Sequence, residues 1–303
     1  MTTQAVPGLV EVEKRATTLV VRVDGGPQQV FGPELALALE AFLDRVEKDP
    51  EVKAVVFTSS HPTRFVSHAD VKWLQEGGAQ YLARAKAGQA APTEPPPPNY
   101  VGLDRLHALF VRMNSIGVVF VAALEGQALG LGAEFSWACD LRVMADADAF
   151  IGQPEILLGI MPGGGGSQRL TRLVGTHRSL VAILDGKPFT PQQALEIGAV
   201  DAVVPKADVV EKAITLAQHL ALRPKAGLAA AKRAVYFGAT LPLGDALKLE
   251  AKEFLGLLVS DQGQELMIAY QAGAEVLGDL PLYVPGQYDE ALAKGRTASN
   301  YGK

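Results

Sequence analysis

The sequence of 303 residues predicts an α/β fold, in which a spiral of ββα units is followed by an α-helical C-terminal region. Two observations lead to this prediction. Short apolar strands alternate with helix-like segments up to about residue 205, and the periodic segments after Asp208 all have helical spacing. We therefore divide the chain into a spiral domain at 1–205, a helical region at 206–280 and an extended tail at 281–303.

The spiral begins with the strand-like residues 17–23, which end at a turn of Asp, Gly, Gly and Pro. Residues 33–49 carry apolar side chains at helical spacing, and residues 54–57 form a short, wholly apolar strand. A polar loop and the turn at 64–70 then lead into a helix that contains Trp73. This order of strand, helix, strand, turn and helix is the order that a repeated ββα unit requires.

Residues 75–100 form an insertion of small, polar and proline residues, and its four consecutive prolines favour an extended polyproline segment. A surface loop is one interpretation of such a segment. Helical spacing resumes at 101–114, and residues 118–123 form the strand that leads into the central part of the chain.

The central stretch, residues 123–175, places a glutamate directly after each of two glycine-rich turns. The first turn opens an apolar helix at 132–139, which carries Glu134 in its first turn. The second segment contains Glu155 and leads through four glycines into another helix. Two carboxylates in apolar, glycine-rich surroundings are the arrangement from which paired acid and base catalysis is built.

The first turn also offers backbone donors. The N–H groups of Leu131 and Gly132 lie at the positive end of the predicted helix, so they can hold an anion or a developing oxyanion. A purely structural interpretation stays open, in which Glu134 only favours the helix dipole and Glu155 lies in a solvated turn. The glycine run lacks the Gly-Lys-Ser/Thr ending of a phosphate-binding loop, which argues against a nucleotide site.

The remaining elements complete the spiral and the helical region. Further strands are predicted at 141–145, 147–151 and 202–204, and a short helix begins at Pro191. Four helices follow at 209–222, 224–237, 243–259 and 262–276. We expect the tail to be disordered or draped over a neighbouring subunit.

Composition and charge exclude several classes of function. Hydrophobic residues make up 48% and charged residues 20% of the chain, which is typical of a globular protein. A net charge of −5 and the lack of a basic run argue against nucleic acid as a partner. The single cysteine, Cys139, leaves no disulfide framework and no metal-binding spacing. With no secretory signal and no membrane-spanning run in the sequence, we expect a cytoplasmic location and no membrane partner.

The central stretch contains the runs AALEGQALGLGAEFSWACDLRV and FIGQPEILLGIMPGGGGSQRLTRLVG. These runs resemble the signature region of the crotonase (enoyl-CoA hydratase/isomerase) superfamily, and the resemblance covers most of residues 17–270. It continues upstream in VVFTSSHPTRFVSHADVKWL and downstream in LDGKPFTPQQALEIGAVDAVVP. It implies a crotonase-like spiral and a helical trimerisation region. In this family the segment at 75–100 lies near the substrate, so a lid is its second interpretation.

The resemblance also implies a substrate and an assembly. The substrate is an acyl-CoA thioester, coenzyme A is part of that substrate, and no separate cofactor or metal is required. The implied assembly is a homotrimer or a dimer of trimers.

By motif position, Glu134 and Glu155 resemble the two catalytic glutamates of the hydratases. Ser67 and Leu131 occupy the positions whose backbone N–H groups form the oxyanion hole. Gly163 matches the position whose N–H helps to hold the reacting water. Tyr270 matches an aromatic residue that approaches the acyl-CoA of an adjacent subunit. Further substrate contacts are implied for His68, Ala69, Asp70 and Gly132.

The chain departs from the family pattern in three places. His68 replaces the commoner glycine, and Leu131 stands where the second of three glycines is usual, but a backbone N–H is lost only to proline. Two interpretations of His68 stay open: a titrating group near the ligand, and a histidine with only a structural hydrogen bond. The basic stretch that usually follows Tyr270 is missing. The remaining candidates for holding CoA phosphates are Lys72, Lys86 and Lys232.

The resemblance favours an enoyl-CoA hydratase, a lyase that adds water across the 2,3 double bond of an acyl-CoA thioester. In this hypothesis the oxyanion hole stabilises an enolate, Glu134 takes a proton from water and Glu155 exchanges the proton at C2. One alternative is another crotonase-type enzyme, such as an isomerase or a hydrolase of a β-dicarbonyl substrate without CoA. A non-catalytic acyl-CoA-binding homologue is the other.

Overall fold

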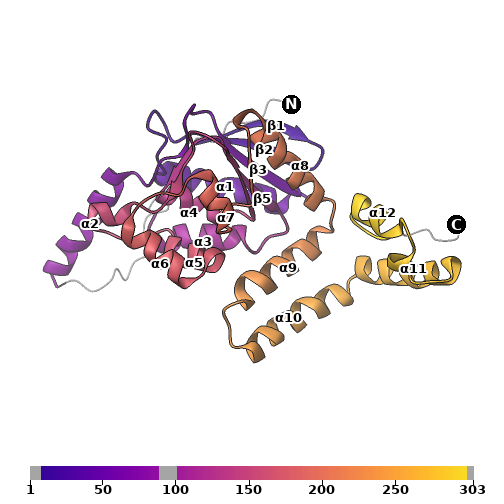
Figure 1. The fold of residues 1–303 in the computed structure, drawn as a ribbon. Coiled ribbons are helices and arrows are strands. Elements are labelled where there is room, and N and C mark those ends of the chain that lie inside the picture. Colours follow the sequence, from indigo (N-terminus) through magenta and orange to yellow (C-terminus); the bar gives the residue numbers. More distant parts are fainter. Residues whose placement is uncertain (1–7, 89–100, 299–303) are drawn as a thin grey trace.

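The computed structural model describes residues 8–88 and 101–298, and it contains two sheets that helices cover (Figure 1). The larger sheet has the strand order β1-β2-β3-β5-β7-β9, and the smaller one has the order β4-β6-β8. Only β1 and β2 pair antiparallel; the other neighbouring strands of both sheets are parallel. This arrangement confirms the predicted α/β class.

The larger sheet holds the long apolar strands of the sequence. Its members are β1 (Leu9–Arg15), β2 (Thr18–Val23), β3 (Ala54–Ser59), β5 (Val119–Leu124), β7 (Leu141–Ala145) and β9 (Ala202–Val204). The smaller sheet consists of β4 (Arg64–Val66), β6 (Gln127–Leu129) and β8 (Ile151–Gly152). Every residue of β5 is buried, as expected for a parallel strand covered on both faces.

The helices fall into a set around the sheets and a C-terminal set. The first set is α1 (Pro33–Lys48), α2 (Val71–Lys86), α3 (Leu103–Met113), α4 (Leu131–Ala138), α5 (Gly166–Val174), α6 (Thr176–Asp185), α7 (Pro191–Glu196) and α8 (Val209–Ala221). The second is α9 (Lys225–Gly238), α10 (Leu243–Leu258), α11 (Asp261–Leu277) and α12 (Gln287–Lys294). Short 3₁₀ turns are η1 (Glu155–Leu158), η2 (Lys206–Asp208) and η3 (Pro281–Tyr283).

An aromatic cluster fixes the position of α4. The ring of Phe135, one residue after Glu134, packs against the rings of Phe31, Phe57, Phe65 and Phe110 at centroid distances of 5.8, 5.1, 5.8 and 5.9 Å. Each such pair contributes roughly 0.5–1.5 kcal/mol beyond the area that it buries. The backbone that carries Glu134 is therefore held by the rigid centre of the fold.

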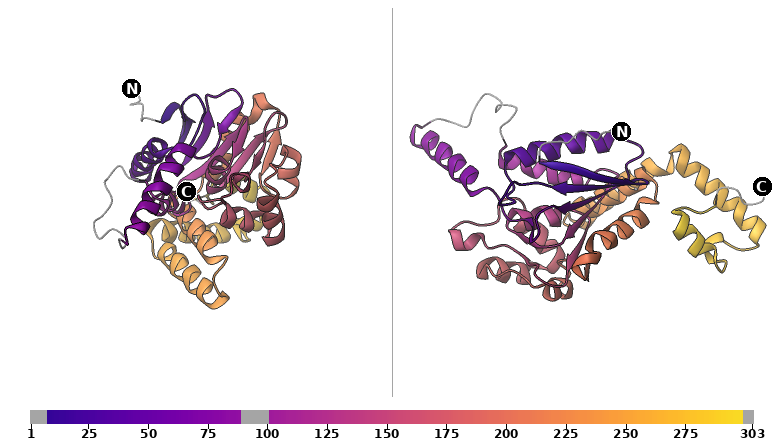
Figure 2. Two further views of the ribbon diagram at one scale, coloured as in Figure 1. Left: turned by 90° about the vertical axis from the view of Figure 1, so that its left-hand side faces the viewer. Right: turned by 90° about the horizontal axis from the view of Figure 1, so that it is seen from above.

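Helix α8 belongs to the body of the spiral. Its residues Val209, Ala213, Ile214, Ala217 and Ala221 are buried in the main core, against the larger sheet. The predicted boundary at residue 206 is therefore wrong for this helix. The chain leaves the body only after α8, and Figure 1 and the right-hand view of Figure 2 show the last four helices extending to one side.

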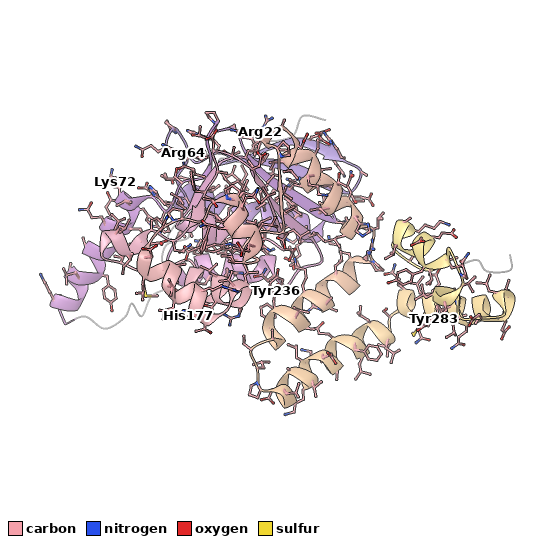
Figure 3. The ribbon with its side chains drawn as sticks, viewed as in Figure 1. Arg22, Arg64, Lys72, His177, Tyr236 and Tyr283 are labelled. Carbon is pink, nitrogen blue, oxygen red and sulfur yellow. The ribbon has the colours of Figure 1, made fainter. Side chains whose placement is uncertain are left out.

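Buried polar contacts attach α9 to the body. Lys232 Nζ lies 2.7 Å from Asp140 Oδ2, and the hydroxyl of Tyr236 donates to Asp140 Oδ1 at 3.1 Å. Tyr236 is labelled on α9 in Figure 3. Helix α10 follows without any buried residue, and its Leu243 and Phe254 side chains are 74% and 59% exposed. Several large apolar side chains of α10 are therefore uncovered within one chain.

Two expectations for irregular segments need correction. Helix α2 continues to Lys86, so the first half of the expected insertion at 75–100 is helical, while residues 89–100 lie outside the described residues. The tail is not extended over its first part, because η3 and α12 form there. Acidic residues in the first turn of α12 and the ion pair between Glu290 and Lys294 stabilise that helix.

Within residues 8–88 and 101–298, no helix combines the length and apolar character that a membrane crossing needs.

Candidate active site

The three strands of the smaller sheet are parallel, so their carboxyl ends meet at one edge. β4 leads into the turn at 67–70, β6 leads into Gly130 and the first turn of α4, and β8 leads into the segment with Glu155. Residues from all three segments line one cavity of about 210 Å³. The sheet thereby brings together the segments that the sequence singled out.

The wall of this cavity is apolar apart from three titratable side chains. Among the described residues these are His68, Glu134 and Glu155. The apolar side chains come from α2, α3, η1 and the loop after η1, and they include Val71, Trp73, Leu74, Leu103, Leu106, Leu158, Ile160 and Met161. An apolar wall excludes water and strengthens each electrostatic contact inside it.

Glu134 lies in the first turn of α4 and is 1% exposed. Its Oε1 accepts the N–H of Gly166, at the start of α5, at 2.6 Å. Burial raises the pKa of Glu134, and this effect exceeds the opposing effects of the Gly166 and Gly164 hydrogen bonds and of the charges on His107 and Arg169. Glu134 is therefore a buried carboxylate with a fixed orientation, which is more than a favourable charge at a helix end.

The glycine run allows the chain to pass directly over this carboxylate. A methyl group on Gly164 would lie 2.6 Å from Glu134 Oε2 and 2.4 Å from Leu131 Cδ1. A methyl group on Gly166 would lie 2.9 Å from Glu134 Oε1 and 2.5 Å from Gln153 Oε1. The run is therefore a close-packing device around Glu134, which agrees with the absence of a phosphate-loop pattern.

Glu155 begins η1 and faces the same cavity. Burial raises its pKa to about 7, the N–H of its own backbone opposes that change, and the charge of Glu134 adds to it. Its Oε2 is buried and has no hydrogen-bond partner among the described residues. The interpretation of Glu155 as a solvated turn residue is therefore wrong. Near neutral pH its protonated and ionised forms coexist, as a group that both gives and takes a proton requires.

One backbone donor stands at the start of α4. Gly130 is the N-cap residue with φ 51°, and Leu131 is the first helical residue, so its N–H has no intrahelical acceptor. No other described residue accepts this N–H. Gly132 permits the close contact with β4, because a methyl group there would lie 2.0 Å from the carbonyl oxygen of Val66.

In the turn at 67–70, the backbone N–H that faces the cavity is not the one that the sequence predicted. The N–H of Ser67 donates to the carbonyl of Gln29 at 2.7 Å, so it is unavailable to a ligand, and the prediction for Ser67 is wrong. A parallel bridge pairs Phe31 with Ala69, and Phe31 bonds there to the carbonyl of His68 and the N–H of Asp70. The N–H of Ala69 points away from this bridge, and Ala69 lines the cavity. Ala69 is therefore the donor of this turn.

A family model described as enoyl-CoA hydratase/isomerase matches residues 26–274. The chain belongs to the enoyl-CoA hydratase/isomerase family. The crystal structure of an enoyl-CoA hydratase from Bacillus anthracis is 25% identical, with a TM-score of 0.73 over 91% of this chain and 98% of that one. An enoyl-CoA hydratase from Thermoplasma volcanium is 25% identical, with a TM-score of 0.69 over 88% and 97%.

The curated relatives are longer proteins. The fatty acid oxidation complex subunit alpha of Shewanella frigidimarina is 34% identical over 63% of this chain and 24% of its own length. The subunit of the same name from Shewanella loihica is 36% identical over 62% and 24%. The chain thus spans about a quarter of the length of these relatives.

Other residues that the family pattern singled out have different positions. Gly163 lines the cavity, and its carbonyl accepts from Nε2 of His107 at 2.7 Å. The carboxylate of Asp70 accepts the N–H of Lys72 at 2.9 Å and so caps α2, outside the cavity. Tyr270 lies on α11 and does not line the cavity of its own chain. Its predicted contact with a neighbouring subunit stays a prediction.

The three lysines that the sequence offered as contacts for CoA phosphates differ in whether a ligand can reach them. Lys232 is bound to Asp140 inside the protein and is therefore not available to a ligand. Lys72 and Lys86 are exposed on α2, and Figure 3 shows Lys72 on the outer side of the body. Lys72 lies 3.8 Å from Glu76 in an exposed ion pair, which contributes little to its position.

Sequence reasoning missed two supporting residues. Gln29 has φ 53° and is 1% exposed, and its Nε2 donates to the carbonyls of Val23 and Phe65 at 2.7 and 2.9 Å. It therefore fixes the loop against which the Ser67 turn is built. Arg169 donates to Asn114 Oδ1 at 2.6 Å and provides a buried positive charge near Glu134. A polar residue in a predicted turn carries no signal of such long-range contacts.

Proposed function

We propose that this chain is an enoyl-CoA hydratase, which adds water across the 2,3 double bond of an acyl-CoA thioester. The observation that carries the proposal is the convergence of two carboxylates, Glu134 and Glu155, with two uncommitted backbone donors, Ala69 and Leu131, on one apolar cavity. Family membership supports an acyl-CoA as the substrate. The names of the Shewanella relatives support a place in fatty acid oxidation.

The thioester carbonyl binds between the N–H groups of Ala69 and Leu131. Both donors are fixed before the substrate arrives, one by the bridge to Phe31 and the other by the first turn of α4. The positive end of α4 adds to the field at the carbonyl oxygen. Such donors stabilise the enolate oxygen more than the ground-state carbonyl, and loss of one typically costs about 100-fold or more in rate.

The two carboxylates then divide the proton transfers. Glu134 takes a proton from water as the water oxygen bonds to C3, and the π electrons of the double bond move onto the thioester oxygen. The enolate collapses, and C2 takes a proton from Glu155. One water molecule is consumed, Glu134 gains a proton and Glu155 loses one, so exchange with solvent restores the site. General acid and base steps of this kind contribute typically about 10²–10⁴-fold.

The presence of two facing carboxylates favours hydration over isomerisation, which needs only one group to move a proton along the acyl chain. A second candidate, a hydrolase of a β-dicarbonyl substrate without CoA, is favoured by two observations. The basic stretch after Tyr270 is missing, and Lys232 is occupied by Asp140. The two candidates differ in whether the ligand carries CoA.

Incubation of the purified protein with crotonyl-CoA tests the proposal. The expected result is loss of the enoyl thioester absorbance together with a product heavier by one water molecule in mass spectrometry. A 3-enoyl-CoA serves as the isomerase substrate, and a cyclic β-diketone serves as the CoA-free substrate. Turnover of either of these without hydration of crotonyl-CoA would contradict the proposal.

We also propose that α10 packs against a second copy of the chain in a trimer or a dimer of trimers. The support is its uncovered apolar side chains, among them Leu243, Leu247 and Phe254, and the family resemblance. Light scattering is expected to give three or six copies for the wild type. Phe254→Glu is expected to lower that number, and an unchanged mass for this variant would count against the assigned surface.

A further inference from the structure

His68 is the third titratable side chain of the cavity, and the proposed reaction leaves it without a role. The residue lines the cavity and is also exposed to solvent. Glu155, in contrast, is half-buried, and its Oε2 has no partner among the described residues. His68 is therefore accessible both from the cavity that contains Glu155 and from bulk water.

A hydrogen bond fixes the tautomer of His68. Its Nδ1 lies 2.7 Å from the carbonyl oxygen of Ala69. Because a carbonyl oxygen only accepts, Nδ1 must carry the hydrogen. In the neutral ring the lone pair is therefore on Nε2, which has no hydrogen-bond partner among the described residues. Nε2 is free to take up and release a proton while Nδ1 keeps its bond.

Gly130 separates His68 from Glu155. A methyl group on Gly130 would lie 3.0 Å from Glu155 Oε1 and 3.2 Å from His68 Cβ. The absence of a side chain at this position leaves the space between the two residues open. Glu155 Oε1 and His68 Cβ therefore flank the same gap.

The charged groups around this turn are otherwise engaged. On the turn itself, the carboxylate of Asp70 accepts the N–H groups of Lys72 and Trp73 at 2.9 and 3.4 Å. On α2, Lys72 pairs with Glu76. From α4, Glu134 is bound to the N–H of Gly166. Glu155 differs from these groups because its Oε2, which has no partner among the described residues, is buried.

We propose that His68 is a proton relay between Glu155 and bulk solvent. This inference rests on the proposed function, because it needs a step in which Glu155 gives its proton to C2. The imidazolium Nε2–H then transfers its proton to the carboxylate of Glu155, which leaves the neutral ring with its Nδ1–H bond intact. Nε2 next takes a proton from water or a buffer acid, and both residues return to their starting states.

The test compares His68→Gln with the wild type in the full-length protein, at low and at high buffer concentration. At low buffer the variant is expected to lose about tenfold in kcat for crotonyl-CoA hydration with an unchanged KM, which is less than the ~100-fold or more that a direct acid or base contributes. Added imidazole is expected to restore the rate of the variant and to leave that of the wild type unchanged. His68→Gly is the second variant and is expected to behave in the same way.

His177→Gln is the matched control, because His177 is an exposed histidine on α6, outside the active-site cavity (Figure 3). It is expected to keep the wild-type rate at every buffer concentration. A wild-type rate for His68→Gln at low buffer, or a loss that imidazole does not restore, would overturn the relay.

A second readout separates the relay from the hydratase proposal. Exchange of the C2 hydrogen of butyryl-CoA with D₂O, followed by NMR, needs Glu155 and the oxyanion donors but no addition of water. Exchange without hydration in the wild type would overturn the hydratase proposal, and the buffer dependence of the exchange rate in His68→Gln would still decide the relay. Hydration without exchange in the wild type would leave the hydratase proposal standing and overturn the relay, because Glu155 would then not move a proton at C2.

Discussion

The carboxylate of Glu134 and the backbone N–H of Gly166 are joined by a hydrogen bond of 2.6 Å. This bond connects the first turn of α4 to the first turn of α5, so the buried carboxylate and the glycine run around it are held together. Substitution of Glu134 changes the charge, and substitution of a glycine changes the packing, so the two contributions can be tested separately.

Glu134→Gln tests the charge. The amide oxygen still accepts the N–H of Gly166, so the fold is expected to be retained, but the amide cannot take a proton from water. We expect kcat for crotonyl-CoA hydration to fall by about 10²–10⁴-fold. Glu196→Gln is the control, because Glu196 is exposed on α7. A Glu134→Gln protein with wild-type turnover would show that another group activates the water.

Gly164→Ala tests the close packing over the carboxylate. The added methyl group would lie 2.6 Å from Glu134 Oε2, so the carboxylate or the loop must shift. Because catalytic geometry tolerates only small displacements, we expect a loss of about 100-fold in kcat/KM. Gly227→Ala is the control, since a methyl group there meets nothing within 4 Å. Equal activity of the two variants would contradict this account of the glycine run.

Leu131→Pro tests the donor at the start of α4. Proline is well tolerated at the first helical position but has no N–H. We expect kcat/KM to fall about 100-fold or more relative to Leu131→Ala, which keeps the N–H and also loses the leucine side chain. Steady-state kinetics of the two variants side by side, with melting curves, isolate the N–H. Similar kinetics for both would remove Leu131 from the oxyanion hole.

Glu155→Gln tests the pKa of Glu155 through stability. The folded protein raises this pKa from 4.5 to about 7, so folding disfavours the ionised form. Between these values the folded state holds a proton that the unfolded state has lost, and the free energy of unfolding therefore falls as pH rises through this window. Glu155→Gln has no carboxyl group at this position, so its free energy of unfolding does not include this fall.

Denaturant unfolding of both proteins from pH 4 to pH 8 checks the prediction. Below about pH 4.5 the two curves are expected to run parallel, and above pH 7 the variant is expected to gain on the order of 2 kcal/mol over the wild type, after allowance for partial solvent exposure. A constant difference across the whole range would mean that Glu155 titrates normally.

The bounds of helices and strands with a clear apolar run could be predicted from the sequence. The apolar run that became α4 was expected at 132–139 and is found at Leu131–Ala138, and the strand at Leu141–Ala145 has the expected bounds. Strands β4, β6 and β8 have three, three and two residues. Strands of this length are too short to show a period of two, so the smaller sheet could not be predicted from the sequence pattern.

The choice between Ser67 and Ala69 depended on a contact that no local pattern encodes. Neighbouring N–H groups of an extended segment point in opposite directions, and the sequence does not show which of them are already bonded. The carbonyl of Gln29, from a loop distant in the chain, settles it by accepting from Ser67. The motif located the turn, and the tertiary structure selected the donor.

The smaller sheet has a consequence for how this site can change. Each of its three parallel strands leads to a separate component: an amide in the turn at 67–70, a second amide and the carboxylate of Glu134 in α4, and the carboxylate of Glu155 after β8. The ends of these strands are also joined, because the N–H of Leu129 donates to the carbonyl of Ser67 and the N–H of Gly130 donates to the carbonyl of Gly152. A shift of the middle strand would therefore move all three components together.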